Sequence, residues 1–432
     1  MFGLEKYQYA ELRFEETESL RLALRDETNL AAGTSYGVSA RVLKNGAWGF
    51  AASNSKNADA GKLLENAEKL AGLQTGKIKV ANTTAEKKKT ADSIKWLDDE
   101  AVLAMVKEAE KETNSKNKLS ANLGFSGTKN SWQFYNSEGR ELDDTTAHFY
   151  FSCSVIAREG SLMQTGLQSA GSRIAADKID MRHVAMDAME MAERLLHADA
   201  PPKGKFQAVL DPEMNGTFIH EVVGHASEAD AIITKESVYA GQLGKKVGNE
   251  LVTIYDDPTL PYFGHYRYDD EGVEGKRASL ITNGVLTGLM NSRESAAELN
   301  QQLNGHARAD SYDSQPIVRM SNTMFKPGKS KLDEVFDIKH GVYIKGSLGG
   351  SVDIFSGGFM FKAKEGNLIE NGQLGKTLRD VAIIGDLKEV LNGITAVGND
   401  FATHPGICGK SGQRAPVEDG GPHIRVNSIT IG

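Results

Sequence analysis

Two histidines, His220 and His225 in the segment HEVVGH, lie five residues apart in a stretch that is predicted to be helical. On an ideal α-helix, residues four apart differ by roughly 40° around the axis, whereas residues five apart differ by roughly 140°. The two rings therefore cannot meet on a regular helix. Either the helix contains a π-bulge with i→i+5 hydrogen bonds, or it ends or distorts at Gly224, because glycine is the weakest ordinary helix former and tolerates unusual dihedral angles.

The helix that carries the two histidines is predicted to run through residues 213–230. Asp211 and Pro212 mark its start, because aspartate caps a helix N-terminus and proline suits the first turn. The residues just before it, 207–211, are predicted to form a strand.

The first half of the chain alternates between strand and helix patterns. Alternating apolar and polar residues predict strands within 7–52 and 117–170, with turns at Asn45-Gly46 and at the NSEG segment, 136–139. Apolar residues at helical spacing predict three helices, at about 58–73, 97–113 and 178–197.

A linker is predicted at 197–206, HADAPPKGKF, where two prolines and a glycine lie in a polar setting. Because 432 residues is long for one core, we expect two domains, 1–200 and 201–432. In the second domain, short strands alternate with glycine-rich turns, including a hairpin that turns at Asn283-Gly284. Strands and helices are mixed without regular βαβ alternation, so the predicted fold class is α+β.

Composition narrows the possible partners and location. The chain has 50 basic and 58 acidic residues and a net charge of −8, which argues against nucleic acid as the main partner. Its most basic run, residues 86–89 (EKKK), is predicted to be a solvated loop. No stretch reaches the ~18 apolar residues of a membrane-spanning helix, and the N-terminus lacks a signal-peptide pattern. The two cysteines, Cys153 and Cys408, are too few to form a disulfide framework, so we expect a cytoplasmic protein. Cys153 lies in an alternating strand pattern and is expected to pack in the core.

The chemistry of HEVVGH is that of a metal-dependent hydrolase. Zinc binds imidazole nitrogen, carboxylate oxygen and thiolate sulfur, and a catalytic zinc keeps three protein ligands and one position for water. Glu221 fits the glutamate of H-E-x-x-H enzymes, which takes a proton from the metal-activated water. By spacing alone, however, two histidines among the ten of this chain can also be a coincidence.

A third ligand is needed, and the residues leave several candidates. Glu228 and Asp230 lie shortly after the second histidine, and His404 and Cys408 lie in HPGICGKSGQ. Flanking glycines and the cation of Lys410 favour a thiolate at Cys408, although an isolated cysteine is more often a small buried apolar residue. The GICGKS segment is not a phosphate-binding loop, because the first glycine of that motif is replaced by His404.

Several segments together resemble one family over nearly the whole chain. They are GVSARVLKNGAWGFA near the start, NSEG at 136, HEVVGHASEAD at 220–230, DDEGVEGKRASLITNGVLTG at 269–288, SNTMFKPG at 321–328, GFMFKAKEGNLIENG at 358–372 and AVGNDFATHPGICGKSGQRAPVEDGGPHIRV at 396–426. On these segments the chain resembles the TldD/PmbA family, also called modulators of DNA gyrase, and specifically its TldD branch.

The resemblance implies a cytoplasmic zinc metallopeptidase with an N-terminal α/β domain and a β-rich C-terminal domain that carries the metal-site helix. It implies that His220, His225 and Cys408 bind Zn²⁺ and that Glu221 is the catalytic base. Glu228 is a candidate to orient one of the histidines. The implied substrates are peptides or poorly folded proteins, which enter a narrow cleft as an extended strand. The implied partner is a homologous subunit of the TldE or PmbA kind, or a second copy of the chain.

Two rival hypotheses remain from the sequence. One is a non-catalytic subunit that binds and regulates another protein, which has no need of a base beside a metal-binding pair. The other is a structural zinc site, which would need a closed set of four ligands. The presence of Glu221 next to His220, with three evident ligands, favours a zinc-dependent peptidase over both.

Overall fold

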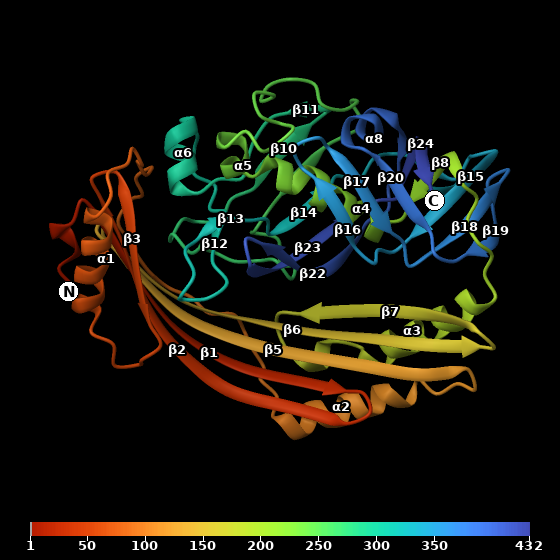
Figure 1. Cartoon of the computed structure of the whole chain (residues 1–432), viewed down its shortest axis with the longest axis horizontal. Helices are drawn as coiled ribbons and strands as arrows, with labels where there is room; N and C mark the ends of the chain where they lie inside the picture. Colours follow the sequence, from red (N-terminus) through yellow and green to blue (C-terminus); the bar gives the residue numbers. More distant parts are fainter. Residues whose placement is uncertain (1) are drawn as a thin grey trace.

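The computed structural model describes residues 2–432, which form a long curved sheet below and a strand-rich part above it (Figure 1). Within these residues the lower sheet has seven strands in the order β3-β2-β1-β5-β6-β4, with β7 paired to β6. Its strands are β1 (Tyr9–Leu24), β2 (Thr28–Lys44), β3 (Ala47–Ser53), β4 (Glu86–Lys89), β5 (Lys118–Asn136), β6 (Arg140–Glu159) and β7 (Leu162–Ser172).

The predicted turns of this sheet are confirmed. Asn45 and Gly46 join β2 to β3 with φ angles of 53° and 69°, the left-handed backbone that a two-residue hairpin turn needs. The NSEG segment joins β5 to β6. Cys153 is fully buried in β6, as its alternating strand pattern predicts.

Three helices of this part confirm the helical patterns, with ends one to three residues inside the predicted ranges: α1 (Ala60–Gly72), α2 (Asp99–Lys111) and α3 (Met181–Leu196). Each starts after an aspartate, Asp59, Asp98 or Asp180, whose side chain accepts a backbone N–H of the first turn. Helices α2 and α3 bury an apolar stripe against the sheet, in a core shared with β1, β5 and β6. They cover its outer face, and the opposite face is turned toward the upper part (Figure 1).

Two expectations for this region are wrong. The strands pair antiparallel except for β4 with β6, so this part is α+β in itself rather than α/β. The basic run 86–89 is the strand β4 rather than a loop. It pairs in parallel with β6, where Lys87 and Lys89 form ion pairs with Glu141 and Asp143.

The upper part contains two larger sheets and a short pair, β12 (Ala307–Arg308) with β13 (Ile317–Val318). In the described part of the chain, one sheet has the order β11-β10-β9-β14-β23-β22, from β9 (Ile254–Asp256), β10 (Ala278–Thr282), β11 (Val285–Leu286), β14 (Asn322–Phe325), β22 (Ala402–Lys410) and β23 (Gln413–Gly421). The predicted hairpin at Asn283-Gly284 joins β10 to β11.

The other sheet has the order β16-β17-β20-β24-β8-β15-β18-β19, with β21 paired to β24. Its strands are β8 (Gly204–Leu210), β15 (His340–Lys345), β16 (Gly350–Asp353), β17 (Gly358–Lys362), β18 (Glu365–Glu370), β19 (Gln373–Leu378), β20 (Ala382–Asp386), β21 (Ile394–Val397) and β24 (Ile424–Ile431). The helices of the upper part are α4 (Pro212–Ile219), α5 (Ala229–Ile233), α6 (Arg293–Leu299), α7 (Leu332–Val335) and α8 (Leu387–Gly393), and short 3₁₀ turns lie at Leu4–Lys6 and Ala176–Lys178.

Helix α4 lies in the core of the upper part. Met214, Phe218 and Ile219 belong to one buried cluster with residues from both larger sheets, such as Leu210 and Val417. The α+β class is thus confirmed. The division at residue 200 stays a prediction, although strands of the lower sheet end at Ser172 and the upper sheets begin at Gly204. None of the helices in residues 2–432 combines the length and apolar character that crossing a membrane requires.

A buried carboxylate joins the strands β9 and β14 of the six-stranded sheet. Asp256 is fully buried and accepts hydrogen bonds from His306 Nε2 at 3.0 Å, the Ser321 amide at 3.0 Å and Thr323 Oγ1 at 2.8 Å. Burial by itself raises the pKa of Asp256, but the hydrogen bonds from His306 and Ser321 outweigh it and lower that pKa below its ordinary value. The carboxylate therefore stabilises the fold in its ionised form.

We expect Asp256→Asn to lower the free energy of unfolding by about 3 kcal/mol, because an amide cannot accept all of these bonds, to which the Ser321 hydroxyl adds another. The stabilisation by Asp256 should be complete above its unfolded pKa of ~4 and be lost as pH falls through the lower folded-state value. Urea unfolding between pH 3 and pH 7 measures both effects. Asp26→Asn, at a side chain that is 89% exposed, is the matched control and should unfold like the wild type.

Candidate metal centre

The two histidines lie on a helix that changes its winding between them. Asp211 caps α4 by accepting the Met214 amide at 2.7 Å, and Pro212 occupies its first turn, as predicted. The next five residues, His220–Gly224, form a π-helical turn, and His225–Ser227 form a 3₁₀ turn. Of the two expected solutions, the structure therefore contains the π-bulge, and the helix does not end at Gly224.

The prediction of one continuous helix over 213–230 is wrong at its C-terminal end. The backbone becomes extended at Glu228, with φ −73° and ψ 123°, before α5 begins. This break turns the Glu228 side chain back toward the ring of His225, which lies three residues earlier.

Gly224 has a packing role in the distorted segment. A Cβ atom at this position would lie 2.0 Å from the Sδ atom of Met320, which is itself fully buried. The glycine therefore lets the π-helical turn lie directly against Met320. Any larger residue would have to displace this turn or the methionine.

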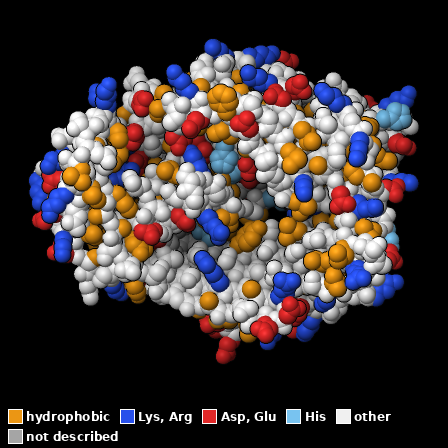
Figure 2. Space-filling view, viewed as in Figure 1, with side chains coloured by type: hydrophobic (Ala, Val, Ile, Leu, Met, Phe, Trp, Pro, Cys, Tyr) orange, Lys and Arg blue, Asp and Glu red, His pale blue; other side chains and the backbone are white. Residues whose placement is uncertain are grey.

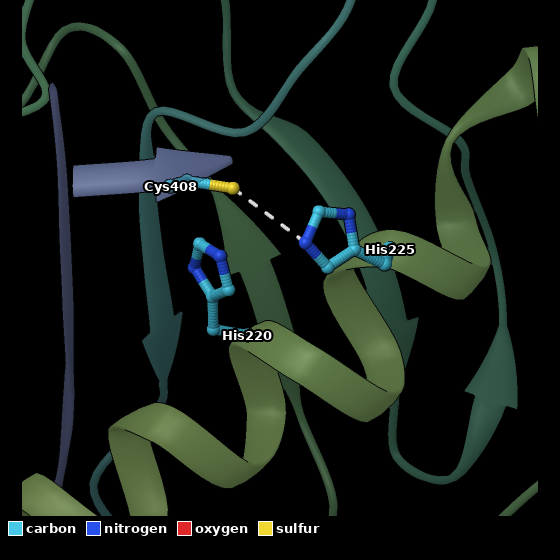
Figure 3. Close-up of side chains that lie close together, drawn as sticks. All are labelled: His220, His225 and Cys408. Carbon is cyan, nitrogen blue, oxygen red and sulfur yellow. Dashed lines mark hydrogen bonds between the residues drawn. The ribbon is translucent and has the colours of Figure 1, made fainter. Parts of the chain in front are cut away.

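The π-helical turn brings the two imidazoles together with Cys408, which lies on β22 (Figure 3). The ring centroids of His220 and His225 are 5.3 Å apart, and the rings are nearly perpendicular, at 89°. Cys408 Sγ lies 3.5 Å from His225 Nε2. One ligand atom from each of the three residues lies within 4.8 Å of the others.

Each imidazole is held by a carboxylate at its other nitrogen. His220 Nδ1 lies 2.7 Å from Asp419 Oδ1 on β23, and His225 Nδ1 lies 3.1 Å from Glu228 Oε2. A carboxylate at Nδ1 selects the tautomer that leaves Nε2 free to act as a ligand. Both rings thus turn their Nε2 side toward the thiol.

The electrostatics of the cluster favour a thiolate. Burial raises the pKa of the Cys408 thiol, but His220 and His225 more than reverse this and lower it to about 4. Burial lowers the pKa of His225, whereas Glu228 and Cys408 raise it to about 10. These directions favour a thiolate next to protonated imidazole. A bound cation would take the place of the imidazole protons.

The cation of Lys410 has a different role from the one expected. Its Nζ lies 3.0 Å from Glu228 Oε2 and 2.6 Å from Asp230 Oδ2, and it donates to the carbonyl of Val318. Lys410 therefore positions the Glu228 carboxylate, which in turn contacts the ring of His225. The low pKa of the thiol comes from the two imidazoles, not from Lys410 as the sequence suggested.

The cluster opens into a cleft of about 280 Å³ between the lower sheet and the upper part. Glu221 lines this cleft beside His220 and Cys408. His404 also lines it, with Nδ1 3.8 Å from Glu213 Oε2, and it is not part of the cluster of candidate ligand atoms. The arrangement therefore joins two buried donors, His220 and Cys408, and the partly exposed His225 with a carboxylate that solvent can reach.

These residues fit a zinc ion. Zn–N distances of about 2.0–2.1 Å and a Zn–S distance of about 2.3 Å in a tetrahedral site place nitrogen and sulfur ligands about 3.6 Å apart. The 3.5 Å between His225 Nε2 and Cys408 Sγ is close to that separation. Two imidazoles and one thiolate also leave a fourth position, which is the pattern of catalytic rather than structural zinc sites.

Sequence reasoning missed Asp419. This residue lies 199 positions after His220, on a strand whose pairing with β22 and β14 brings it to the ring. Its carboxylate follows an ordinary strand pattern, so nothing local marks it. The pKa of Asp419 is raised to about 6 by burial, against the opposing effect of His220.

A largely buried set of two imidazoles and a thiolate, next to an accessible carboxylate, is an arrangement that metal-dependent hydrolases use. Comparison with known families agrees with this class. Residues 203–432 match the PmbA/TldA metallopeptidase C-terminal domain, residues 93–196 the central domain, and residues 10–71 domain 1. The chain belongs to the PmbA/TldD metallopeptidase family and is a metalloprotease of the TldD kind.

Relatives of similar length support this assignment. The chain is 37% identical to a metalloprotease of Methanothermobacter thermautotrophicus, over 99% of this chain and 96% of the relative. It is 30% identical to a zinc metalloprotease TldD homolog of Saccharolobus solfataricus, over 98% and 96%.

Solved structures show the same fold. A putative modulator of a DNA gyrase from Thermotoga maritima superposes with a TM-score of 0.82 at 20% identity, covering 98% of this chain and 96% of that one. TldE from Thermococcus kodakarensis superposes with a TM-score of 0.78 at 18% identity, covering 100% and 98%. At these identities, the likeness concerns the fold alone.

The contact between Gly224 and Met320 yields a prediction whose sign is opposite to helix propensity. In an exposed helix, Gly→Ala stabilises by about 1 kcal/mol. Here Gly224→Ala should lower the free energy of unfolding by about 1–3 kcal/mol, because the added methyl overpacks the core. It should also weaken zinc binding, because the π-helical turn positions both rings.

Urea unfolding and competition with a zinc-binding dye measure the two effects of Gly224→Ala. The double variant Gly224→Ala/Met320→Ala should bind zinc more tightly than the single variant, since the shorter side chain vacates the space that the methyl needs. Equal zinc affinity of wild type and Gly224→Ala would contradict the positioning role of the turn.

Proposed function

We propose that the protein is a zinc-dependent peptidase in which His220, His225 and Cys408 hold the metal and Glu221 is the general base. The observation that carries this proposal is the convergence of the two Nε2 atoms and the thiol beside Glu221 in one cleft. A bound zinc ion supplies Lewis acidity, which lowers the pKa of a water molecule and polarises the carbonyl of a peptide bond.

The protein's own residues would divide the remaining work. Glu228 and Asp419 fix the tautomers of the histidines, so that neither ring has to reorient. The carboxylate of Glu221 accepts a proton from the attacking water and returns it to the leaving amine. His404, beside Glu213 in the same cleft, is placed to contact substrate rather than metal.

The substrate that the cleft supports best is a peptide, or a poorly folded protein, in extended form. Strand β22 is an edge strand of its sheet, and in the described residues its backbone pairs with β23 alone. Its other edge is therefore available for an added strand, a common mode of peptide recognition. Next to Cys408, the side chain of Ile407 is 50% exposed in the cleft and offers an apolar contact to such a strand.

A homologous subunit of the TldE or PmbA kind, or a second copy of the chain, is the partner we propose. The support is the shared fold with TldE of Thermococcus kodakarensis. Light scattering of the purified chain, alone and with a co-expressed homologue, distinguishes a homodimer from a heterodimer. A monomer in both samples would count against either partner.

Metal analysis tests the ligand assignment. Purified wild type should contain about one zinc per chain, and Cys408→Ala should lose most of it. Cys153→Ala is the matched control, because it removes the other cysteine, buried in β6 and remote from the histidines. Normal zinc content in Cys408→Ala would show that another residue, such as His404, completes the site.

Hydrolysis by Glu221→Gln tests the base. This variant should keep its zinc and cleave an unstructured peptide roughly 10²–10⁴-fold more slowly than wild type. Glu236→Gln, an exposed glutamate after α5, should cleave at the wild-type rate. Unchanged cleavage by Glu221→Gln would refute the mechanism, and a zinc-loaded wild type without any peptidase activity would favour the non-catalytic binding subunit.

A further inference from the structure

The cleft at the metal centre continues into a larger one of about 500 Å³. Tyr150 and Ile407 line both, so the two clefts join at these side chains. The larger cleft, called here the arginine cleft, lies between the lower sheet and the loops around β12 and β23. The surface is hollowed near the centre of the view, and both basic and acidic side chains border the hollow (Figure 2).

Arg308 lines the arginine cleft as a buried cation without a counter-ion. It is 9% exposed, and no carboxylate of residues 2–432 lies within 4.0 Å of its guanidinium. Its Nη1 donates to the carbonyls of Met320 and Pro416, both at 2.7 Å, and its Cζ lies 5.0 Å from the centroid of the Tyr266 ring, contacts that hold the group in place without a carboxylate partner. Burial lowers the pKa of Arg308, and repulsion from Arg319 adds to this, against the opposing effects of Tyr266, Asp270 and Asp256.

Two more arginines line the same cleft, Arg414 on β23 and Arg21 on β1. Both are exposed, and in the described structure neither forms an ion pair. Arg414 lies opposite Gly409 in the β22–β23 register, next to the pair of Cys408 with Ala415. Pro416, which accepts from Arg308, lies opposite Ile407. Arg414 and Arg308 therefore lie beside the strand that carries Cys408.

Most acidic residues of the cleft wall already have a cationic or amide partner. Glu15 and Asp270 both pair with Arg13 at 2.9 Å, and Asp144 pairs with Arg267 at 2.8 Å. A further carboxylate, Asp269, is 2% exposed and points into backbone amides rather than into the cleft.

Asp310 is the exception. Among residues 2–432 it is the one acid of this cleft that has neither a cation within 4.0 Å nor a buried set of amide donors. The lining holds four arginines and five carboxylates, but within the described residues three of the arginines have no carboxylate within 4.0 Å, and of the carboxylates Asp310 alone lacks both a cation and amide donors. A bound carboxylate would pair with these guanidinium groups.

We propose that the arginine cleft is a substrate subsite that takes an aspartate or glutamate side chain of the peptide, a few residues from the bond that is cleaved. The inference rests on the peptidase function proposed above and adds a substrate class to it. A guanidinium matches a carboxylate with two parallel hydrogen bonds, and such charge-assisted bonds are stronger than neutral ones. Aromatic side chains of the wall, Tyr150 and Tyr266 among them, shield this pair from water.

A peptide series tests the subsite. One unstructured parent peptide is varied position by position to Glu, Gln or Lys, each with a free or an amidated C-terminus. At the responsive position, kcat/KM for Glu should exceed that for Gln by roughly tenfold, with Lys lowest. The preference should persist in amidated peptides. A preference that disappears on amidation would show that the cleft takes the C-terminal carboxylate and would overturn the side-chain assignment.

Substitutions in the cleft show which residues cause the preference for Glu over Gln. The quantity compared is the ratio of kcat/KM for the Glu peptide to kcat/KM for the Gln peptide. Arg414→Gln, at an exposed position that folding tolerates, should reduce the ratio several-fold, and Arg414→Glu should bring the Lys peptide above the Glu peptide. Arg308→Lys keeps a cation and should retain part of the ratio, whereas Arg308→Met should remove most of it. Arg158→Gln, an exposed arginine outside the cleft that donates to the Gly160 carbonyl, is the matched control and should leave the ratio unchanged.

Binding separates this inference from the proposed catalysis. Fluorescence anisotropy of the labelled Glu and Gln peptides is measured on zinc-loaded Glu221→Gln, where cleavage is suppressed. Tighter binding of the Glu peptide supports the subsite even if wild type cleaves nothing, in which case only the peptidase function fails. Cleavage of both peptides at equal rates, or equal binding of both, overturns the subsite. Binding of an oligonucleotide in competition with the Glu peptide would assign the cleft to nucleic acid instead.

Discussion

The π-helical turn at His220–Gly224 is the feature on which the candidate metal centre depends. One extra residue per turn rotates His225 toward His220, so that both rings face Cys408 on β22. The turn is possible because α4 is buried between two sheets and because Gly224 lets it lie against Met320. A local irregularity of the backbone is thus maintained by packing on every side, as is common for π-bulges at functional sites.

The charges around the cluster are arranged in layers. Two imidazoles and a thiol are innermost, the carboxylates of Asp419 and Glu228 hold the outer nitrogens, and Lys410 holds Glu228. Each layer carries the sign opposite to the one it contacts. A buried cation site of this kind avoids uncompensated charge. The arginine cleft differs, because its buried guanidinium is held by carbonyls and an aromatic ring without a carboxylate partner, and this contrast is what marks it as a site for an anion.

Local patterns were sufficient for most elements. The hairpin turns at Asn45-Gly46 and Asn283-Gly284, the capped helices and the start of α4 follow from turn chemistry, apolar spacing and capping, which act within a few residues. The predictions that were wrong concern segments whose conformation depends on contacts with residues far away in the sequence. The EKKK run becomes a strand because β6 offers it a hydrogen-bonding edge and acidic partners, and the helix breaks at Glu228.

The sequence by itself determined that two histidines five apart need a distorted helix, that Glu221 lies beside them, and that Cys408 was a candidate third ligand. The tertiary structure alone decided which distortion occurs, and that Cys408 rather than His404 reaches the cluster. It also decided that Asp419 holds His220 and that Arg308 lacks a counter-ion. The physical reason is that dihedral preferences and periodicity are local, whereas these contacts join residues that are far apart in the chain and meet only when the sheets pack.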